Sequence, residues 1–345
     1  MKAIRLTAWE QPAELASVPE PEPGPGEVLL RVAGAGLCHS DLHLMHWRAG
    51  TLPYELPFTL GHEVAGTVAA LGPGADGIEV GEPVLVYGPW GCGRCPACSV
   101  GAEHLCEVGG TGRGAGLGLD GGLAEYMVVP SPRLTVPLDG LDPVAAAPLA
   151  DAGLTPYHAI RRVLPLLRPG TTAIVIGVGG LGHVAVQLVK ALSPARVVAV
   201  DRREQALEVA ARSGADAVLP AADLTSSQLR AAAGGRGAAV VVDCVGTDDT
   251  LALAAGAIAP GGHVSVLGLA GGTFPMRAGA VPLETSVIFS NWGTREELAE
   301  VVELARAGAI AVETERVPLA AVPAAYERLA AGGCNGRVVA VPRDA

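Results

Sequence analysis

The stretch AIVIGVGGLGHVAVQLVKAL (residues 173–192), followed by RVVAVD (196–201), decides the fold of this chain. Its first four residues are wholly apolar and predict a buried strand, and the apolar residues after the glycines recur at helical spacing, which predicts a helix from Gly180 to Leu192. The second apolar run predicts another strand, which ends in Asp201. Strand, glycine turn, helix and strand together form a βαβ unit.

The same alternation continues along the chain. Apolar runs separated by helix-length segments rich in Ala and Leu predict further strands at residues 217–219, 239–242, 263–267 and 286–290. This order is typical of the α/β class and predicts a doubly wound (Rossmann) parallel sheet over residues 151–290.

Residues 1–150 follow a different pattern, in which short β-like runs alternate with Gly/Pro turns. The runs lie at 27–32, 64–71, 83–87 and 124–129. They predict an irregular, mostly β domain, with a cysteine-rich lobe at 91–107.

The C-terminal segment, residues 291–345, is expected to return to the first domain. After Trp292, a capping box at Thr294 and Glu297 predicts a helix that ends near Gly308, and residues 337–341 predict a final strand.

The glycine run after the first buried strand satisfies the pattern G-x-G-x-x-G. Its members are Gly177, Val178, Gly179, Gly180, Leu181 and Gly182. Because the run follows a strand and opens a helix, it predicts a dinucleotide site whose pyrophosphate lies at the helix N-terminus. A glycine-rich turn without a ligand is the alternative.

The end of the second strand bears on the choice of dinucleotide. Asp201 can accept hydrogen bonds from ribose hydroxyls and would repel a 2′-phosphate, which favours NAD over NADP. Arg202 and Arg203 follow it, and either could hold a phosphate or belong to a solvated helix start.

The charge balance excludes some partners. Acidic residues outnumber basic ones by 35 to 24, which gives a formal net charge of −11 without a dense Lys/Arg stripe, so no nucleic-acid partner is expected. No run approaches the roughly 18 apolar residues of a membrane span, and the N-terminus does not resemble a signal peptide. We therefore expect a cytoplasmic protein that does not bind membranes.

Four of the seven cysteines crowd into one short segment with the spacing C-x2-C-x2-C-x7-C. They are Cys92, Cys95, Cys98 and Cys106. In a reducing compartment this spacing indicates metal ligation more than disulfides, and four thiolates close a tetrahedral shell, as in a structural zinc site. An iron–sulfur cluster is disfavoured because the rest of the chain offers hydride chemistry and not one-electron chemistry.

Three further segments are CHSD (38–41), GHEVAG (61–66) and DAGLT (151–155). With the four-cysteine lobe and the glycine run, they make the chain resemble the zinc-containing medium-chain alcohol dehydrogenases over essentially its full length, and most of all NAD-dependent bacterial secondary alcohol dehydrogenases. The resemblance implies a GroES-like first domain, two zinc ions per chain, and hydride transfer between an alcohol and NAD(H).

By this resemblance, Cys38, His62 and Asp151 hold the catalytic zinc, with an open fourth position that acidifies an alcohol or polarises a carbonyl. The family carries cysteine or aspartate at the third position, so Asp151 departs from the Cys2His form. Glu63 is then a nearby second carboxylate that approaches the metal during ligand exchange, and Asp41 orients His62. Local turn and salt-bridge chemistry is the alternative for both, since residues 38–41 and 61–63 are expected to lie on turns.

The resemblance also assigns a proton path. Ser40 hydrogen-bonds the alcohol, and the proton passes through the cofactor ribose toward His43, whose ordinary pKa suits a shuttle near neutral pH. An exposed turn histidine is the alternative for His43 and for His46. His39 and Arg337 are expected to lie toward the cofactor pyrophosphate.

Four residues stand where the family places the walls of the substrate pocket: Tyr54, Leu119, Leu269 and Trp292. Because only 3% of the residues are aromatic, large rings near the zinc favour a hydrophobic secondary or aryl alcohol and its ketone, and leave primary alcohols and aldehydes open. Core packing is the alternative for each aromatic residue. The family also implies a homodimer or homotetramer, paired through edge strands near residues 286–290.

Two other hypotheses compete. A polyol dehydrogenase would keep the catalytic zinc but need a polar pocket, which the aromatic residues and leucines oppose. A non-catalytic NAD-binding or redox-sensing protein of the same fold would lack zinc, and the presence of Cys38, Ser40, His62 and Asp151 together argues against it.

Overall fold

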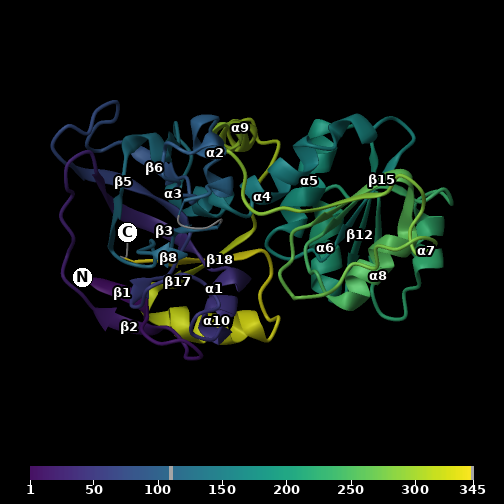
Figure 1. The fold of residues 1–345 in the computed structure, drawn as a ribbon, viewed down its shortest axis with the longest axis horizontal. Helices are drawn as coiled ribbons and strands as arrows, with labels where there is room; N and C mark the ends of the chain where they lie inside the picture. The colour runs from purple at the N-terminus through teal and green to yellow at the C-terminus, as the bar shows by residue number, and fades with distance from the viewer. Residues whose placement is uncertain (109–111, 343–345) are drawn as a thin grey trace. The chain divides into compact units, whose positions relative to one another are not determined.

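The chain divides into two compact units in the computed structural model, which describes residues 1–108 and 112–342. Unit 1 comprises Met1–Leu154, Trp292–Arg306 and Val312–Ala345. Unit 2 comprises Thr155–Asn291 and Ala307–Ala311. Figure 1 labels several elements of each unit.

Unit 2 is built on a six-stranded sheet with the order β13-β12-β11-β14-β15-β16. Its strands are β11 (Thr172–Ile176), β12 (Arg196–Asp201), β13 (Ala217–Pro220), β14 (Ala238–Asp243), β15 (Ile258–Val266) and β16 (Ser286–Phe289). All neighbouring strands in this order pair in parallel. The chain runs outward from β11 to β13 and then crosses back to β14, so the switch point lies between β11 and β14. The predicted α/β class and parallel sheet are confirmed.

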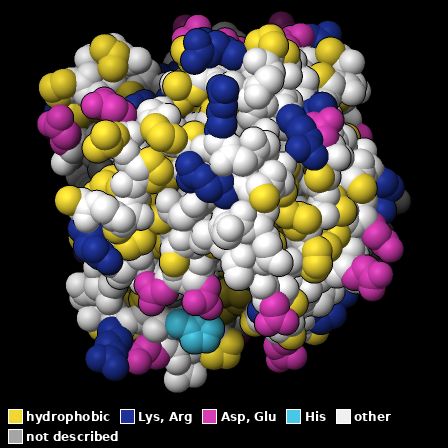
Figure 2. Space-filling view, turned by 90° about the vertical axis from the view of Figure 1, so that its right-hand side faces the viewer, with side chains coloured by type: hydrophobic (Ala, Val, Ile, Leu, Met, Phe, Trp, Pro, Cys, Tyr) yellow, Lys and Arg dark blue, Asp and Glu magenta, His cyan; other side chains and the backbone are white. Residues whose placement is uncertain are grey.

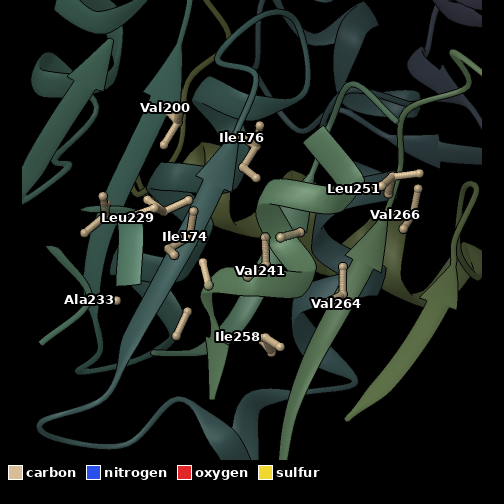
Figure 3. Close-up of a cluster of buried hydrophobic side chains, with 14 residues drawn as sticks. Ile174, Ile176, Val200, Leu229, Ala233, Val241, Leu251, Ile258, Val264 and Val266 are labelled. Carbon is tan, nitrogen blue, oxygen red and sulfur yellow. The ribbon is translucent and has the colours of Figure 1, made fainter. Parts of the chain in front are cut away.

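Helices pack on this sheet and bury its side chains. They are α5 (Gly182–Leu192), α6 (Glu204–Arg212), α7 (Ser226–Ala232) and α8 (Asp248–Ala257), and a further helix, α4 (Leu154–Arg161), precedes β11 in the chain. Leu229 of α7 and Leu251 of α8 pack against one face of the sheet, which presents Ile174, Val241 and Val264 (Figure 3). Helix α5 packs against β11 and β12, and this packing sets the glycine run at the end of β11.

Unit 1 contains a seven-stranded, mostly antiparallel sheet with the order β10-β6-β5-β3-β18-β17, and β9 also pairs with β3. The strands are β3 (Val28–Gly36), β5 (Glu63–Leu71), β6 (Pro83–Val86), β9 (Tyr126–Val129), β10 (Thr135–Pro137), β17 (Thr314–Pro318) and β18 (Arg337–Val341). A smaller sheet joins β2 (Glu14–Ser17), β1 (Lys2–Leu6) and β4 (Phe58–Thr59), and β7 (Gly114–Ala115) pairs with β8 (Gly118–Leu119). Because β18 pairs with β3, this C-terminal strand is part of the main sheet.

The helices of unit 1 are α1 (His39–His46), α2 (Pro96–Ser99), α3 (Pro143–Ala146), α9 (Arg295–Arg306) and α10 (Val322–Ala330). The capping box predicted for α9 is confirmed, because Thr294 N donates to Glu297 Oε2 at 2.8 Å and Glu297 N donates to Thr294 Oγ1 at 3.1 Å. The expectation that residues 38–41 lie on a turn is wrong, because they open α1.

The described helices include none with the length and apolar character needed to cross a membrane. Figure 2 shows one face of the molecule, on which Lys and Arg side chains are interspersed with Asp and Glu and with hydrophobic side chains.

Candidate active site

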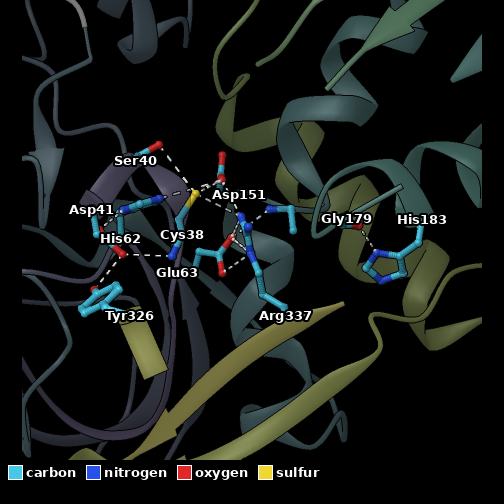
Figure 4. Close-up of polar contacts among 11 residues, drawn as sticks. Cys38, Ser40, Asp41, His62, Glu63, Asp151, Gly179, His183, Tyr326 and Arg337 are labelled. Carbon is cyan, nitrogen blue, oxygen red and sulfur yellow. Dashed lines mark hydrogen bonds and ion pairs between the residues drawn. The ribbon is translucent and has the colours of Figure 1, made fainter. Parts of the chain in front are cut away.

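Three buried side chains from distant parts of the sequence meet within unit 1: Cys38, His62 and Asp151 (Figure 4). Their metal-binding atoms all lie within 4.8 Å of one another. Cys38 Sγ is 3.7 Å from Asp151 Oδ2, and His62 Nε2 is 3.9 Å from the same oxygen. The structure thus brings together the three residues that the resemblance assigns to the catalytic zinc.

Strand pairing explains why these segments meet. β3 ends at Gly36 and β5 begins at Glu63, and these two residues are paired across the antiparallel strands. A Cβ on residue 36 would lie 1.9 Å from Glu63 Oε2, so only glycine permits this close approach. The 3-10 helix η3 (Ala147–Ala150) packs on both strands and is followed directly by Asp151.

Asp41 connects the start of α1 to the histidine. Cys38 is the N-cap of α1, and Asp41 Oδ2 accepts a hydrogen bond from Cys38 N at 2.9 Å, which completes a capping box. Asp41 Oδ1 faces His62 Nδ1 at 3.3 Å, so the ring presents its other nitrogen, Nε2, toward Asp151. Tyr326 of α10 donates its hydroxyl to Asp41 Oδ2 at 2.9 Å.

Arg337, at the start of β18, is buried beside the three candidate ligands. It donates to both carboxylate oxygens of Glu63, at 2.5 to 3.0 Å, and also contacts Asp151 Oδ2 at 3.0 Å and Cys38 Sγ at 3.3 Å. Burial raises the pKa of Glu63, and Asp151 adds to this rise while Arg337 opposes it. We predicted a place for Arg337 toward the pyrophosphate, whereas its described partners are the carboxylates and the thiol of this site.

The donor set fits a zinc ion. Thiolate, imidazole and carboxylate are the usual zinc ligands, and tetrahedral coordination at the usual bond lengths separates such atoms by about 3.3 to 3.8 Å. The separations of 3.7 and 3.9 Å lie close to that range before any metal draws the atoms in. Glu63 and Arg337 carry opposite charges and form an ion pair, so a divalent ion bound by Cys38 and Asp151 would leave the site near neutrality.

The four-cysteine lobe forms a second cluster, with all four sulfur atoms within 4.8 Å of one another. Cys95 Sγ is 3.5 Å from Cys98 Sγ and 3.9 Å from Cys106 Sγ, close to the roughly 3.8 Å edge of a zinc–thiolate tetrahedron. Backbone N–H groups lower the pKa of Cys95 to about 6, whereas burial and the adjacent sulfur atoms raise the pKa of Cys98 to about 12. All four are free thiols, so the cluster fits a cation that stabilises four thiolates together.

Helix α1 carries the residues predicted to move protons. Ser40 Oγ lies 3.6 Å from Cys38 Sγ, and His43 follows three residues later, on the same face of the helix. His43 is half-buried, and burial, assisted by His46, lowers its pKa below the ordinary value of 6.5. His39 and His46 are exposed, and His46 Nδ1 contacts the Leu42 carbonyl at 2.6 Å.

The predicted pocket residues are divided between the two units. In unit 1, the Trp292 ring is buried and meets the His62 ring edge-on, with 6.1 Å between centroids. Tyr54 is half-buried and donates to the Gly112 carbonyl at 3.2 Å, in the segment that leads to Leu119. Leu269 is exposed in unit 2.

The glycine run in unit 2 has the geometry of a dinucleotide cradle. Gly177 has a φ of +84°, and a Cβ at Gly182 would lie 1.9 Å from the Gly177 carbonyl oxygen. A Cβ at Gly179, in contrast, would meet nothing within 4 Å, so space for a ligand is present beside the turn. Asp201 is buried at the end of β12 and accepts a hydrogen bond from Val178 N at 2.7 Å.

The other residues of unit 2 that were predicted for the dinucleotide site belong to the glycine run or directly follow β12. Gly180 and Leu181 are half-buried directly before α5, and Arg202 is exposed directly after β12. Arg203 N donates to Asp201 Oδ1 at 2.9 Å, so the carboxylate is already held in place by the backbone on both sides.

Sequence reasoning missed Tyr326, whose hydroxyl reaches Asp41 from 285 positions away. Its only sequence signal is an aromatic residue at an apolar position of a helix, which usually indicates core packing.

Two family models match the chain. Residues 24–140 match the alcohol dehydrogenase GroES-like domain family, and residues 180–307 match the zinc-binding dehydrogenase family. An NAD-dependent alcohol dehydrogenase from Sulfurisphaera tokodaii is 37% identical over 99% of this chain and 100% of its own length.

Two solved structures are also similar. The alcohol dehydrogenase of Aeropyrum pernix is 36% identical, with a TM-score of 0.92 over 99% of this chain and 100% of that chain. The acetophenone reductase of Geotrichum candidum, solved in complex with NAD, is 32% identical, with a TM-score of 0.86 over 99% of this chain and 96% of that one.

Proposed function

Because the chain belongs to the zinc-containing medium-chain alcohol dehydrogenase family, we propose that Cys38, His62 and Asp151 hold its catalytic zinc. The observation that carries this proposal is the meeting of a thiol, an imidazole and a carboxylate, all buried, at separations of 3.7 and 3.9 Å. The four-cysteine lobe holds a second, structural zinc.

The protein is an NAD-dependent zinc alcohol dehydrogenase that interconverts alcohols and ketones. When bound, the zinc supplies Lewis acidity toward the substrate oxygen, and NAD supplies the hydride acceptor. Asp41 contacts His62, and Arg337 contacts Asp151. Each of these contacts orients the proposed ligand side chain that it reaches.

The chain must also move the proton of the alcohol. Ser40 lies beside Cys38 and hydrogen-bonds the substrate hydroxyl, and His43 on the same face of α1 takes the proton onward. The lowered pKa of His43 keeps its ring neutral at pH 7, which is the form that accepts a proton. Glu63 is the second carboxylate near the proposed metal position. Its ion pair with Arg337 keeps it from binding the metal.

NAD is the preferred cofactor, bound by the cradle of unit 2. Asp201 retains lone pairs for the adenosine ribose hydroxyls, and its charge repels the 2′-phosphate of NADP. Arg202 lies next to it and is exposed. A cofactor site near this turn also accounts for the open space beside Gly179.

The preferred substrates are secondary alcohols and their ketones with a hydrophobic or aryl group. Trp292 meets the His62 ring edge-on, so an indole lies next to the proposed metal position. The similar acetophenone reductase supports an aryl ketone as a substrate of this chain also.

A panel of ketones, aldehydes and sugars, each assayed with NADH and with NADPH, tests this proposal. We expect the highest kcat/KM for aryl and aliphatic ketones with NADH. A preference for sugars would contradict the proposal that the substrate pocket is hydrophobic. A preference for NADPH would contradict the proposal that Asp201 selects NAD.

We also propose a dimer or tetramer in the cytoplasm. β16 is the edge strand of the parallel sheet, and Phe289 and Leu283 beside it are 59% and 84% exposed. Sedimentation as a single chain at micromolar concentration would contradict the oligomer. The four-thiol metal lobe supports a reducing compartment.

A further inference from the structure

Asp41 is a fully buried carboxylate that serves two of the proposed zinc ligands. Its Oδ2 accepts the backbone N–H of Cys38 at 2.9 Å, and its Oδ1 faces Nδ1 of His62 at 3.3 Å. A buried carboxylate is stable only when donors satisfy its oxygens, so its orientation depends on every donor that reaches it.

The hydroxyl of Tyr326 reaches Asp41 Oδ2 from outside α1. Tyr326 lies on α10, which packs against α1, and its hydroxyl donates to Asp41 Oδ2 at 2.9 Å (Figure 4). Burial, with Asp41 nearby, raises the pKa of Tyr326 well above its ordinary value of 10, so the phenol keeps its proton and donates.

These contacts form a buried chain from phenol to carboxylate to imidazole. With two donors on Oδ2, the Asp41 carboxylate is fixed in its plane, and Oδ1 is left for the His62 ring. When Nδ1 of His62 carries the proton, the lone pair of Nε2 is free to bind a metal. Nε2 is also the ring atom that faces Asp151.

We propose that Tyr326 is a positioning residue for the catalytic zinc: by holding Asp41, it keeps His62 oriented with Nε2 toward the metal. The inference rests on the proposed ligand set of Cys38, His62 and Asp151. It adds a residue of α10 to the contacts that Arg337 and Trp292 of the C-terminal segment already make with the proposed ligands.

The test measures the rate at which zinc leaves the purified protein for a chromogenic chelator. Tyr326→Phe removes one hydroxyl and keeps the ring that packs α10. We expect one of the two zinc equivalents to leave about 10-fold faster than in the wild type, the lower end of the effect of losing an outer partner of a metal-bound histidine. The other equivalent, in the four-cysteine lobe, should leave at its wild-type rate.

Tyr87→Phe is the matched control, because Tyr87 is equally buried and donates its hydroxyl to the Gly293 carbonyl at 2.7 Å instead of to Asp41. It should lower the melting temperature about as much as Tyr326→Phe does and leave both zinc release rates unchanged. If zinc release were accelerated equally in the two variants, Tyr326 would contribute only general packing, and the inference would be overturned.

A double-mutant cycle with Asp41→Asn separates positioning from packing. If Tyr326 acts through Asp41, its removal should change zinc release by less than about 2-fold in the Asp41→Asn background, because coupled residues are not additive. Full additivity, or a wild-type release rate in Tyr326→Phe, would overturn the inference. A wild-type protein with zinc in the four-cysteine lobe alone would instead contradict the proposed ligand set.

Discussion

His43 tests the proposed proton path at the scale of one residue. His43→Gln keeps hydrogen-bonding capacity but removes the titrating group, so kcat/KM for alcohol oxidation should fall about 10²-fold at neutral pH. In the wild type the pKa of His43 lies below its ordinary value of 6.5, so the ring stays neutral at any pH above that lowered pKa and can accept a proton. The loss should shrink as pH rises, because hydroxide then takes the proton directly. The pH profiles of kcat/KM for the two proteins measure this.

His46→Gln is the control for the same helix, since His46 is exposed and lies six residues from Ser40, twice as far along the chain as His43. It should match the wild type at and above neutral pH. If His43→Gln also matched the wild type across the whole profile, His43 would be a surface residue of α1 without a catalytic role.

The sequence points more readily to the proposed metal ligands than to the residues that contact them. The spacing of Cys92 to Cys106 indicates a metal without any structure, and the resemblance supplied Cys38, His62 and Asp151. Arg337 and Tyr326 were misplaced or missed, because their partners Glu63 and Asp41 are 274 and 285 positions away. Ion pairs and hydrogen bonds at such separations leave no periodicity in the sequence.

At the scale of elements, α1 shows how tertiary packing decides a local structure. Its sequence HSDLHLMH contains three histidines, which favour a helix only weakly, and we expected a turn. The helix forms because Asp41 completes a capping box with Cys38 and because Leu42, Leu44 and Met45 are buried. A cysteine at the N-cap is an uncommon start signal, which explains the error.

The four-cysteine lobe gives a prediction at the same scale. Cys95→Ser should remove about one zinc per chain and lower the melting temperature, because the closed site contributes its binding free energy to folding. Metal analysis and thermal unfolding together measure this.

Cys244→Ser is the control, because Cys244 is a half-buried free thiol of unit 2, whereas the four-cysteine cluster belongs to unit 1. It should keep both zinc ions whatever its effect on stability. Two zinc ions and an unchanged melting temperature in Cys95→Ser would refute the structural role of the lobe.

At the scale of the whole molecule, the alternation of apolar runs with helical segments was enough to predict the parallel sheet of unit 2. The inner strands β11, β12 and β14 are buried along nearly their whole length, so their sequences are almost continuously apolar. The sheet of unit 1 joins strands from both ends of the chain, β3 and β18, and no local pattern specifies such a pairing. Its order could therefore be learned only from the structure.

The central claim is that one zinc lies among Cys38, His62 and Asp151 and a second lies in the four-cysteine lobe. Anomalous X-ray diffraction on either side of the zinc absorption edge, from crystals of the protein purified without added metal, tests it most directly. We expect two peaks per chain, one about 2.0 to 2.3 Å from Cys38 Sγ, His62 Nε2 and Asp151 Oδ2, and one at bonding distance from four sulfur atoms. A single peak in the lobe, with Arg337 still on Asp151 and Cys38, would contradict it.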